Sequence, residues 1–265
     1  MKKNISVISI ITAVMLLAAM LSLSLTVSAE SDSISVTVTI SNAGELVLTA
    51  TPVTVTDADG DGKLTVNDAL LCAHIAHYKD GASGYKSEDS GFGLSLATLW
   101  GVSNGGSYGY YLNDTSCMSL ADVVKQGDSL YAFSYKDLTS WSDMYAYFES
   151  EKTADGVTLT LKAAGYDENW APVTLSISGA VITVDGKETE YVTDADGKVT
   201  VPFSTENGRH IISAVSADKT ITPPVYAYTV GATGDNGIAL AAILALVALS
   251  AVFAMAKAIK HASRV

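Results

Sequence analysis

The sequence has little of the chemistry on which enzymes depend. Its 265 residues include only four histidines and two cysteines, and no serine lies in the Gly-x-Ser-x-Gly turn that exposes the nucleophile of many hydrolases. The chain also has neither a phosphate-binding loop nor the glycine fingerprint of a dinucleotide site. Because no nucleophile, base or cofactor loop stands out, the sequence predicts a protein that is not an enzyme.

Basic residues are scarce as well. Between positions 30 and 235 the chain carries all 28 of its acidic residues but only 11 basic ones, which gives this part a net charge of about −17. Nucleic acid is bound through basic patches, so this charge excludes nucleic acid as a partner. A bound divalent cation would relieve part of the self-repulsion.

Long apolar runs are confined to the two ends. Residues 1–29 read as a secretory signal peptide, because Lys2 and Lys3 precede an apolar run that ends at the small residues Val27-Ser28-Ala29. An uncleaved anchor is the alternative, since the run is long. Cleavage would leave a mature chain that begins near Glu30.

The second apolar run, residues 238–256, has Ser250 as its one polar member. At about 1.5 Å per residue, a helix of this length spans a hydrocarbon layer roughly 30 Å thick. The basic residues of the tail, 257–265, favour the cytoplasmic side, and residues 231–237 form a short spacer. No LPxTG sorting motif precedes the spacer. We therefore expect a single-pass transmembrane helix at the cell membrane and an extracellular ectodomain.

The two cysteines, Cys72 and Cys117, both belong to the expected ectodomain. A disulfide persists in an oxidising compartment, whereas two free thiols are the alternative, in particular in a cell that lives without oxygen. The sequence leaves both states open.

Residues 57–68 have the order of a calcium-binding loop. Carboxylates occupy positions 1, 3, 5 and 12, a backbone carbonyl is available at position 7, and position 9 offers a hydroxyl or a bridging water. The predicted ligands are Asp57, Asp59, Asp61, Lys63 through its carbonyl, Thr65 and Asp68. Gly62 lies at position 6, where the loop turns sharply. Hard oxygen donors in this order suit Ca²⁺ better than Mg²⁺; the alternative is an acidic surface turn.

The segments around this loop predict one compact unit over residues 30–138. Alternating apolar residues in 34–40 and 46–55, separated by Asn42-Ala43-Gly44, predict a hairpin. The loop follows this hairpin directly, which excludes a full EF-hand. Thr65 and Asp68 resemble a capping box at the start of a helix over 66–78. A surface loop over 79–93 and further strands near 108–113 and 129–136 complete a β-grasp order: a four-stranded sheet under one helix, hence an α+β fold.

Two segments resemble known families. Gly-Tyr-Tyr-Leu-Asn-Asp at 109–114 and Val-Lys-Gln-Gly-Asp-Ser-Leu-Tyr-Ala-Phe-Ser-Tyr at 124–135 are similar to the ending of a family of unknown function. That family is related to the C-terminal β-grasp domain of transcobalamin and intrinsic factor. The resemblance covers about residues 34–137 and implies a fold and a ligand-binding surface, although Phe133 stands where a Trp is common. Residues 57–78 resemble a dockerin half-site, and the second half-site of a dockerin is missing.

Residues 139–230 predict an all-β second unit. Short alternating stretches lie at 157–161, 173–177, 181–184, 199–201, 210–215 and 225–230, and turns such as Asp185-Gly186 and Asn207-Gly208 separate them. This spacing is typical of an immunoglobulin-like sandwich, and the stretch resembles bacterial Ig-like modules. Asp194 to Thr205 starts like a calcium loop but has Lys198 at position 5 and Thr205 at position 12, so we interpret it as a hairpin turn.

Aromatic residues gather between positions 100 and 147. They are Trp100, Tyr108, Tyr110, Tyr111, Tyr131, Tyr135, Trp141, Tyr145 and Tyr147. An outward-facing set could stack on a sugar, a corrin-like ring or a partner chain; alternatively, these residues cover a thin sheet and a domain junction. We therefore expect a calcium-stabilised, membrane-anchored binding protein that captures a small ligand at the cell surface, with a cobalamin-like molecule as one candidate. The alternative is an adhesion or scaffold protein that binds a protein or glycan partner, with docking onto a cohesin-like receptor as a third hypothesis.

Overall fold

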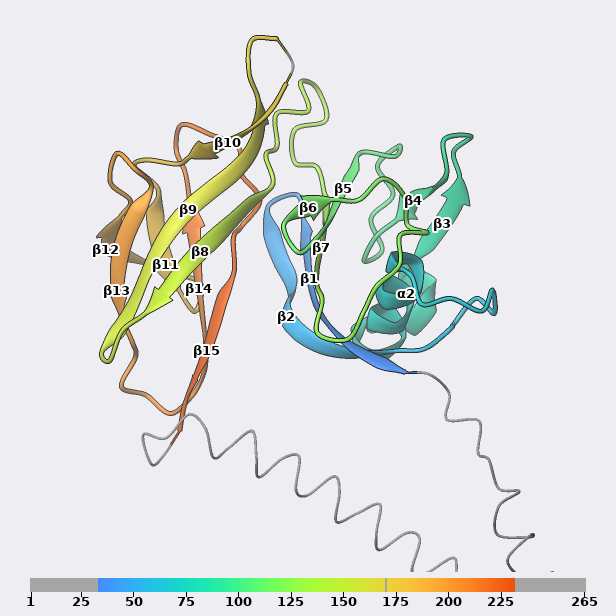
Figure 1. The fold of residues 1–265 in the computed structure, drawn as a ribbon, viewed down its shortest axis with the longest axis horizontal. Helices are drawn as coiled ribbons and strands as arrows, with labels where there is room; N and C mark the ends of the chain where they lie inside the picture. Colours follow the sequence, from blue (N-terminus) through green and yellow to red (C-terminus); the bar gives the residue numbers. More distant parts are fainter. Residues whose placement is uncertain (1–32, 170, 232–265) are drawn as a thin grey trace, which may run out of the picture.

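The computed structural model describes residues 33–169 and 171–231 and is largely β, with several sheets and one short α-helix (Figure 1). The expected signal peptide 1–29, most of the spacer 231–237, the expected transmembrane helix 238–256 and the tail 257–265 lie outside these residues. Within the described ranges, no helix has the length and hydropathy needed to cross a bilayer.

The first unit is built on a five-stranded sheet of order β2-β1-β7-β5-β6. Its strands are β1 Ile34–Asn42, β2 Glu45–Val55, β5 Tyr108–Leu112, β6 Thr115–Ser116 and β7 Ser129–Ser134. The central strands β1 and β7 are parallel, whereas β1–β2, β5–β7 and β5–β6 are antiparallel. The expected hairpin is confirmed, with Ala43 (φ 47°) and Gly44 (φ 86°) in the tight turn. The short strand β6 adds a fifth strand to the four expected.

Helix α2, Val66–His77, lies against β1 and β2 on one face of this sheet (Figure 1). It begins where the sequence predicts, because Thr65 and Asp68 form a reciprocal capping box. Leu70 and Ala73 are buried in a core that also contains Val36 and Leu130 from the sheet. The helix and the sheet thus bury one another's apolar faces.

The prediction of a surface loop over 79–93 is only partly correct. It contains the 3₁₀ turn η1, Gly81–Gly84, and strand β3, Lys86–Asp89, which pairs with β4, Leu94–Thr98. The residues of β3 are polar and mostly exposed, so the strand carries no apolar alternation. Strand β3 forms because its backbone hydrogen-bonds to β4, and its own side chains give no sign of a strand in the sequence.

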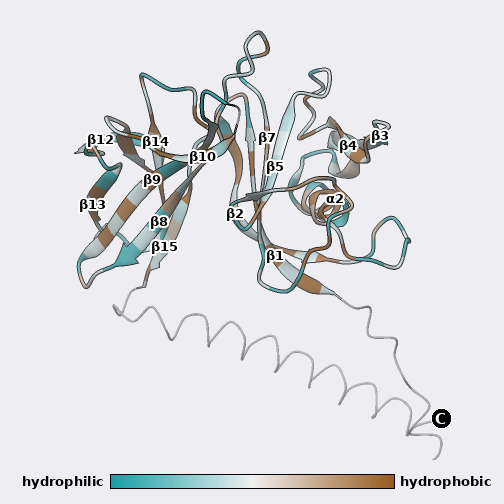
Figure 2. Ribbon diagram, turned by 45° about the horizontal axis from the view of Figure 1, so that its top comes forward, coloured by the Kyte–Doolittle hydropathy of each residue, from teal (hydrophilic) through white to brown (hydrophobic). Residues whose placement is uncertain are grey.

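The second unit consists of two four-stranded antiparallel sheets. One contains β8 Ala146–Lys152, β9 Gly156–Tyr166, β10 Pro172–Ser176 and β13 Lys198–Pro202; the other contains β11 Val181–Val184, β12 Lys187–Val192, β14 Gly208–Val215 and β15 Tyr226–Val230. Hydrophobic and hydrophilic residues alternate along β9 (Figure 2). Its inward residues join a core with members from both sheets, such as Leu159 and Ile182.

An aromatic cluster joins the two units. Tyr131 and Phe133 of β7 point away from α2 and are buried with Tyr145, which precedes β8. The Tyr131 hydroxyl donates a hydrogen bond to the carbonyl of Pro223 at 2.8 Å. At another point of the junction, Arg209 donates to the carbonyls of β2, at 2.6 Å for Thr49. The second face of the first sheet is therefore covered by the second unit.

Candidate functional site

The acidic loop connects the end of β2 to the start of α2. Asp57, Asp59 and Asp61 are exposed, and one carboxylate oxygen from each lies within 4.8 Å of the others. The structure thus brings together the first three carboxylates of the predicted calcium ligands. Adjacent carboxylates repel one another. A cation bound between them would offset this repulsion, so the arrangement suits a cation.

Backbone N–H groups curl the loop around Asp57. The Oδ1 atom of Asp57 accepts from the N–H of Gly60 at 2.8 Å and of Asp61 at 3.1 Å, and its Oδ2 atom accepts from Gly62 at 2.9 Å. Gly62 has φ of 82°, a value that disfavours a side chain. The turn at position 6 is therefore formed as the sequence predicts.

The other two carboxylates of the cluster are also held in place. Asp59 accepts from the side-chain amide of Asn67 at 2.8 Å, and Asp61 accepts from the N–H of Lys63 at 2.9 Å. Asn67 in turn accepts from the hydroxyl of Tyr85 at 2.7 Å. Burial raises the pKa of Tyr85 above its ordinary value, so this hydroxyl stays protonated and remains a donor. The first turn of α2 thus fixes the orientation of Asp59.

Asp68, at position 12, lies beneath the loop and is fully buried. Its Oδ1 atom accepts from the N–H of Ala58 at 2.8 Å, while Oδ2 accepts from the N–H and the hydroxyl of Thr65 at 3.0 and 2.7 Å. Asp68 and Thr65 therefore tie the loop to the helix. Neither belongs to the group of three close carboxylates, so their roles as ligands, and that of the Lys63 carbonyl, stay predictions.

The donor set of this loop fits Ca²⁺ in its chemistry. It offers three carboxylates on a short loop, and all their donor atoms are hard oxygens, which Ca²⁺ accepts in flexible geometry. Leu64, at position 8, is half-buried and packs against the core of the first unit, so the loop is attached at both ends. Asp57, Asp59 and Asp61 would hold the ion.

His74, three residues before His77 on α2, has both of its ring nitrogens engaged in hydrogen bonds. The N–H of Trp100 donates to Nε2 of His74 at 2.9 Å, so Nδ1 carries the proton and donates to the carbonyl of Leu70 at 2.6 Å. Burial lowers the pKa of His74, although the hydrogen bond to Leu70 opposes this. His77 is exposed at the end of α2. His74 is accordingly a neutral packing residue.

Most of the clustered aromatic residues are packing residues as well. Tyr111 and Tyr145 stack with their ring centroids 3.9 Å apart, and Tyr131 meets Tyr145 edge-on at 5.3 Å. Trp100 and Tyr108 instead pack against the core under α2. The sheet face that the sequence offers for ligand stacking is thus occupied by the junction between the units. Trp141 is an exception and is 63% exposed.

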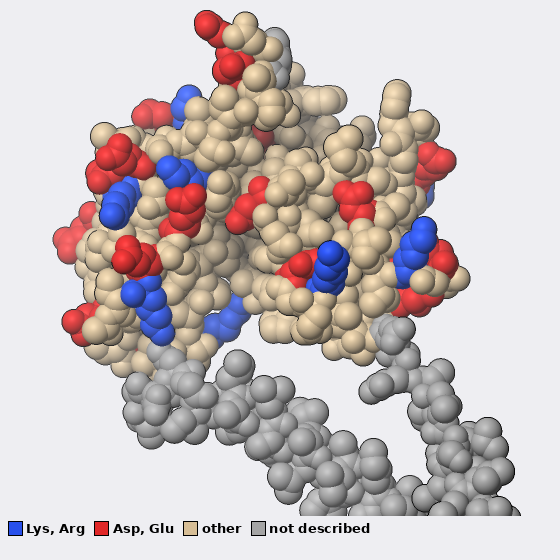
Figure 3. All heavy atoms as spheres, in the orientation of Figure 1, with Lys and Arg blue, Asp and Glu red and all other residues tan. Residues whose placement is uncertain are grey.

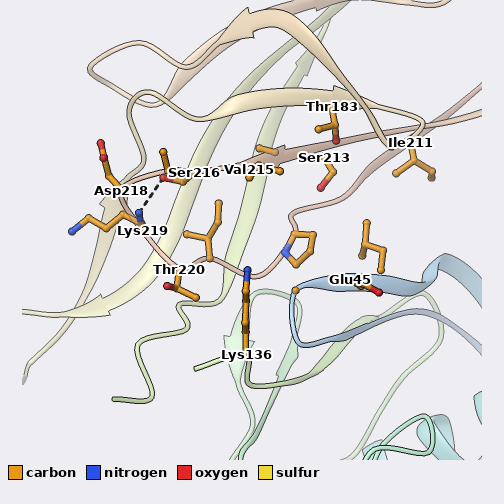
Figure 4. Close-up of a pocket in the computed structure, with 17 residues that line it drawn as sticks. Glu45, Lys136, Thr183, Ile211, Ser213, Val215, Ser216, Asp218, Lys219 and Thr220 are labelled. Carbon is orange, nitrogen blue, oxygen red and sulfur yellow. Dashed lines mark hydrogen bonds between the residues drawn. The ribbon is translucent and has the colours of Figure 1, made fainter. Parts of the chain in front are cut away.

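A cleft of about 660 Å³ lies at this junction (Figure 4). Glu45 of β2 and Lys136 line it from the first unit, and Thr183 and Ser213 line it from strands β11 and β14 of the second. Lys136 extends from the first unit toward the second (Figure 4). In the described part of the chain, none of the ion pairs involves Lys136.

Comparison with protein-family models, curated proteins and solved structures finds no match. Sequence reasoning did not identify the cleft, because its lining residues come from positions as far apart as 44 and 223 and form no local motif.

Both cysteines are free thiols in the structure. Each is partly buried against the core of the first unit. Burial and the nearby carboxylate of Asp122 raise the pKa of Cys117 to about 11. The Cys117 thiol is therefore protonated near neutral pH and is a poor nucleophile.

Proposed function

We propose that this protein is a membrane-anchored, extracellular binding protein that is stabilised by calcium and captures a small ligand between its two units. The observation that carries ligand capture is the cleft of about 660 Å³ at their junction, since small-molecule sites favour concave surfaces between domains. The apolar runs at both ends of the sequence support export and anchoring, and the strongly acidic composition agrees with a bound cation.

The proposal includes a finer description of the fold. The parallel pairing of β1 with β7, between two antiparallel neighbours and beneath α2, supports a β-grasp domain over residues 30–138. Two packed antiparallel sheets with one shared core support an Ig-like sandwich over 139–230. In this arrangement the sandwich forms one wall of the cleft.

Calcium would act on stability rather than on chemistry. Held by Asp57, Asp59 and Asp61, it would neutralise three exposed carboxylates and fix the loop that precedes α2. A ligand present at a hundred times its dissociation constant stabilises the folded state by about 2.7 kcal/mol. The loop therefore couples the fold to the calcium concentration outside the cell.

Equilibrium titration tests capture in the cleft. The probes are cobalamin, which the family resemblance suggests, and short carboxylates, which Lys136 would attract. We expect one of them to bind in a 1:1 complex that Lys136→Met weakens, while Lys125→Met, at an exposed lysine that does not line the cleft, has no effect. Absence of binding by all probes, or equal binding by both variants, would contradict the proposal.

The second candidate is an adhesion or scaffold protein that binds a surface protein or glycan. One observation favours it: large aromatic side chains are exposed, Phe92 and Trp141 on loops and Tyr166 at the end of β9. A docking role for the single calcium loop is weaker, because the described residues contain one such acidic cluster and a dockerin requires two. Deletion of residues 57–78 without loss of a partner would exclude that role.

A further inference from the structure

The loop over residues 137–143 holds its shape through two aspartates. The carboxylate of Asp137 accepts from the N–H groups of Thr139 and Ser140 at 2.9 and 3.0 Å, and from the hydroxyl of Ser142 at 2.7 Å. These donors lower the pKa of Asp137 to about 2. Asp143 closes the base of the loop, where it accepts from the N–H groups of Lys136 and Asp137, both at 2.8 Å.

This loop presents Trp141 to solvent. The side chain is 63% exposed, and its indole N–H donates to the carbonyl of Leu138 at 3.1 Å. Trp141 has φ of 53°, a left-handed conformation that is unfavourable for a bulky residue. The polar edge of the indole is thus satisfied within the loop, while its ring stays largely open to solvent.

A second exposed aromatic residue lies beside the base of this loop. Ala146 of β8 pairs with Ala163 of β9, and the N–H of Ala164 donates to the carbonyl of Tyr145. Continued in this antiparallel register, Tyr166 comes opposite Asp143. Burial raises the pKa of Tyr135, and its electrostatic interactions with Asp143 and Tyr166 raise this pKa further. Asp143 and Tyr166 therefore both lie near Tyr135. Tyr166 is 67% exposed.

The surroundings of these rings select the kind of ligand. Thr139 and Ser140, which carry hydroxyl groups, are exposed beside Trp141, whereas the hydroxyl of Ser142 and the carboxylates of both aspartates are engaged in the hydrogen bonds that hold the loop. The neighbouring β9–β10 loop carries acidic and no basic side chains at its tip (Figure 3). A flat ring beside hydroxyl donors suits a pyranose, whose C–H face is apolar and whose edge is polar. The acidic surroundings disfavour an anionic glycan.

The position of the loops agrees with a ligand outside the membrane. Figure 1 shows the 137–143 loop and the β9–β10 loop at the end of the molecule opposite to the last residues of β15 and the first residues of β1. The expected membrane helix follows β15 in the sequence, so these loops would face away from the membrane. This step rests on the extracellular placement in the proposed function but does not depend on the cleft.

We propose that Trp141 and Tyr166 form a platform that binds a neutral polysaccharide by stacking on its sugar rings. The chemistry distinguishes this site from the cleft, which is lined by Lys136 and Glu45. The platform would hold the cell against a glycan surface, while the cleft takes up a small molecule.

Affinity electrophoresis and tryptophan fluorescence test the proposal on the full chain, kept in a detergent that has no sugar headgroup. The probes are soluble amylose, xylan, cello-oligosaccharides and chitin hexasaccharide, with polygalacturonate as the anionic comparison. We expect at least one neutral glycan to bind, and Trp141→Asn to weaken it about tenfold or more, because the ring that covers the sugar is lost. Asn tolerates a positive φ, so this variant should fold; Trp141→Tyr should retain most of the binding.

Two controls separate the platform from other surfaces. Phe92→Ala removes a side chain that is 97% exposed on another loop and should leave glycan binding unchanged. Lys136→Met should impair only the cleft, so either proposal can fail while the other stands. Binding of no neutral glycan, preference for polygalacturonate, or full binding by Trp141→Asn would overturn the platform. Capture of an envelope protein that persists after its glycans are removed, and is abolished by Trp141→Asn, would also overturn it.

Discussion

Replacement of Asp68 by alanine separates the structural role of the acidic loop from its role in metal binding. The Asp68 side chain is fully buried and accepts hydrogen bonds from Ala58 and from both donors of Thr65. Loss of the capping interaction costs about 1 kcal/mol, and each buried donor left unpaired costs roughly 1–3 kcal/mol. Because water can reach part of the opened site, we expect a total of about 2–4 kcal/mol.

This loss should appear even when calcium is removed. Urea unfolding of the full chain in chelator, followed by circular dichroism, should show Asp68→Ala less stable than the wild type by this amount. Asp61→Ala is the matched control, since Asp61 is exposed and should change stability by about 0.5 kcal/mol or less in chelator. If Asp68→Ala were as stable as Asp61→Ala in chelator, the buried capping network would not exist in the metal-free protein.

Three further predictions concern other parts of the molecule. The ring N–H groups of the buried His210 donate to the Asp185 carboxylate and to the Glu206 carbonyl, and these bonds raise the pKa of His210; the pKa of Asp185 is lowered because the bonds that it accepts from His210 and from the N–H of Ile211 outweigh its desolvation. The stability that Asp185 contributes is therefore present above its ordinary pKa of 3.8 and is lost as the pH falls through the lowered pKa, whereas the stability that His210 contributes is present below 6.5 and is lost as the pH rises through the raised pKa. The difference in melting temperature between the wild type and His210→Asn should be largest between pH 3.8 and 6.5, and a difference that does not change with pH would contradict this pairing. Gly109→Ala should destabilise the protein by about 1–3 kcal/mol in a urea titration, because the new Cβ would clash with the ring of Phe133; an unchanged midpoint would show that the junction is loosely packed. Cys117, with a pKa of about 11, should react slowly with iodoacetamide at pH 8, where on the order of one thiol in a thousand is ionised, and rapid labelling in a variant whose other cysteine is serine would refute its burial.

Local patterns in the sequence predict much of this fold. The hairpin of β1 and β2 follows from alternation and from a turn that ends in Gly44, and the start of α2 follows from the Thr65–Asp68 pair. In the second unit, alternation also predicts the strands with buried apolar residues, such as β9 and β14. Each of these signals depends on residues close together in the chain.

Strands without such a signal were missed. Strands β3, β8 and β12 carry many charged and exposed residues, and each is paired by a neighbour with stronger apolar alternation or lies at a sheet edge. Charged residues are common on edge strands because they discourage pairing with other chains. Their sequences therefore resemble loops, and their position is set by contacts that the strand itself does not encode.

The site was predictable only where it is local. The spacing of Asp57, Asp59 and Asp61 in a short loop places their carboxylates together, as the structure shows. By contrast, alternation predicts that Tyr131 and Phe133 share one face of β7 but not what covers that face. The cover is the second unit, whose docking depends on residues far away in the chain, and the same holds for the cleft.

The central claim is that the acidic loop binds one calcium ion. Calorimetric titration of Ca²⁺ into the chelator-treated full chain tests it most directly, with a variant that carries both Asp57→Asn and Asp61→Asn as the control. We predict a single saturable uptake of one ion per chain, and its loss in the variant. Absence of heat up to millimolar Ca²⁺, or equal uptake by the variant, would contradict the account.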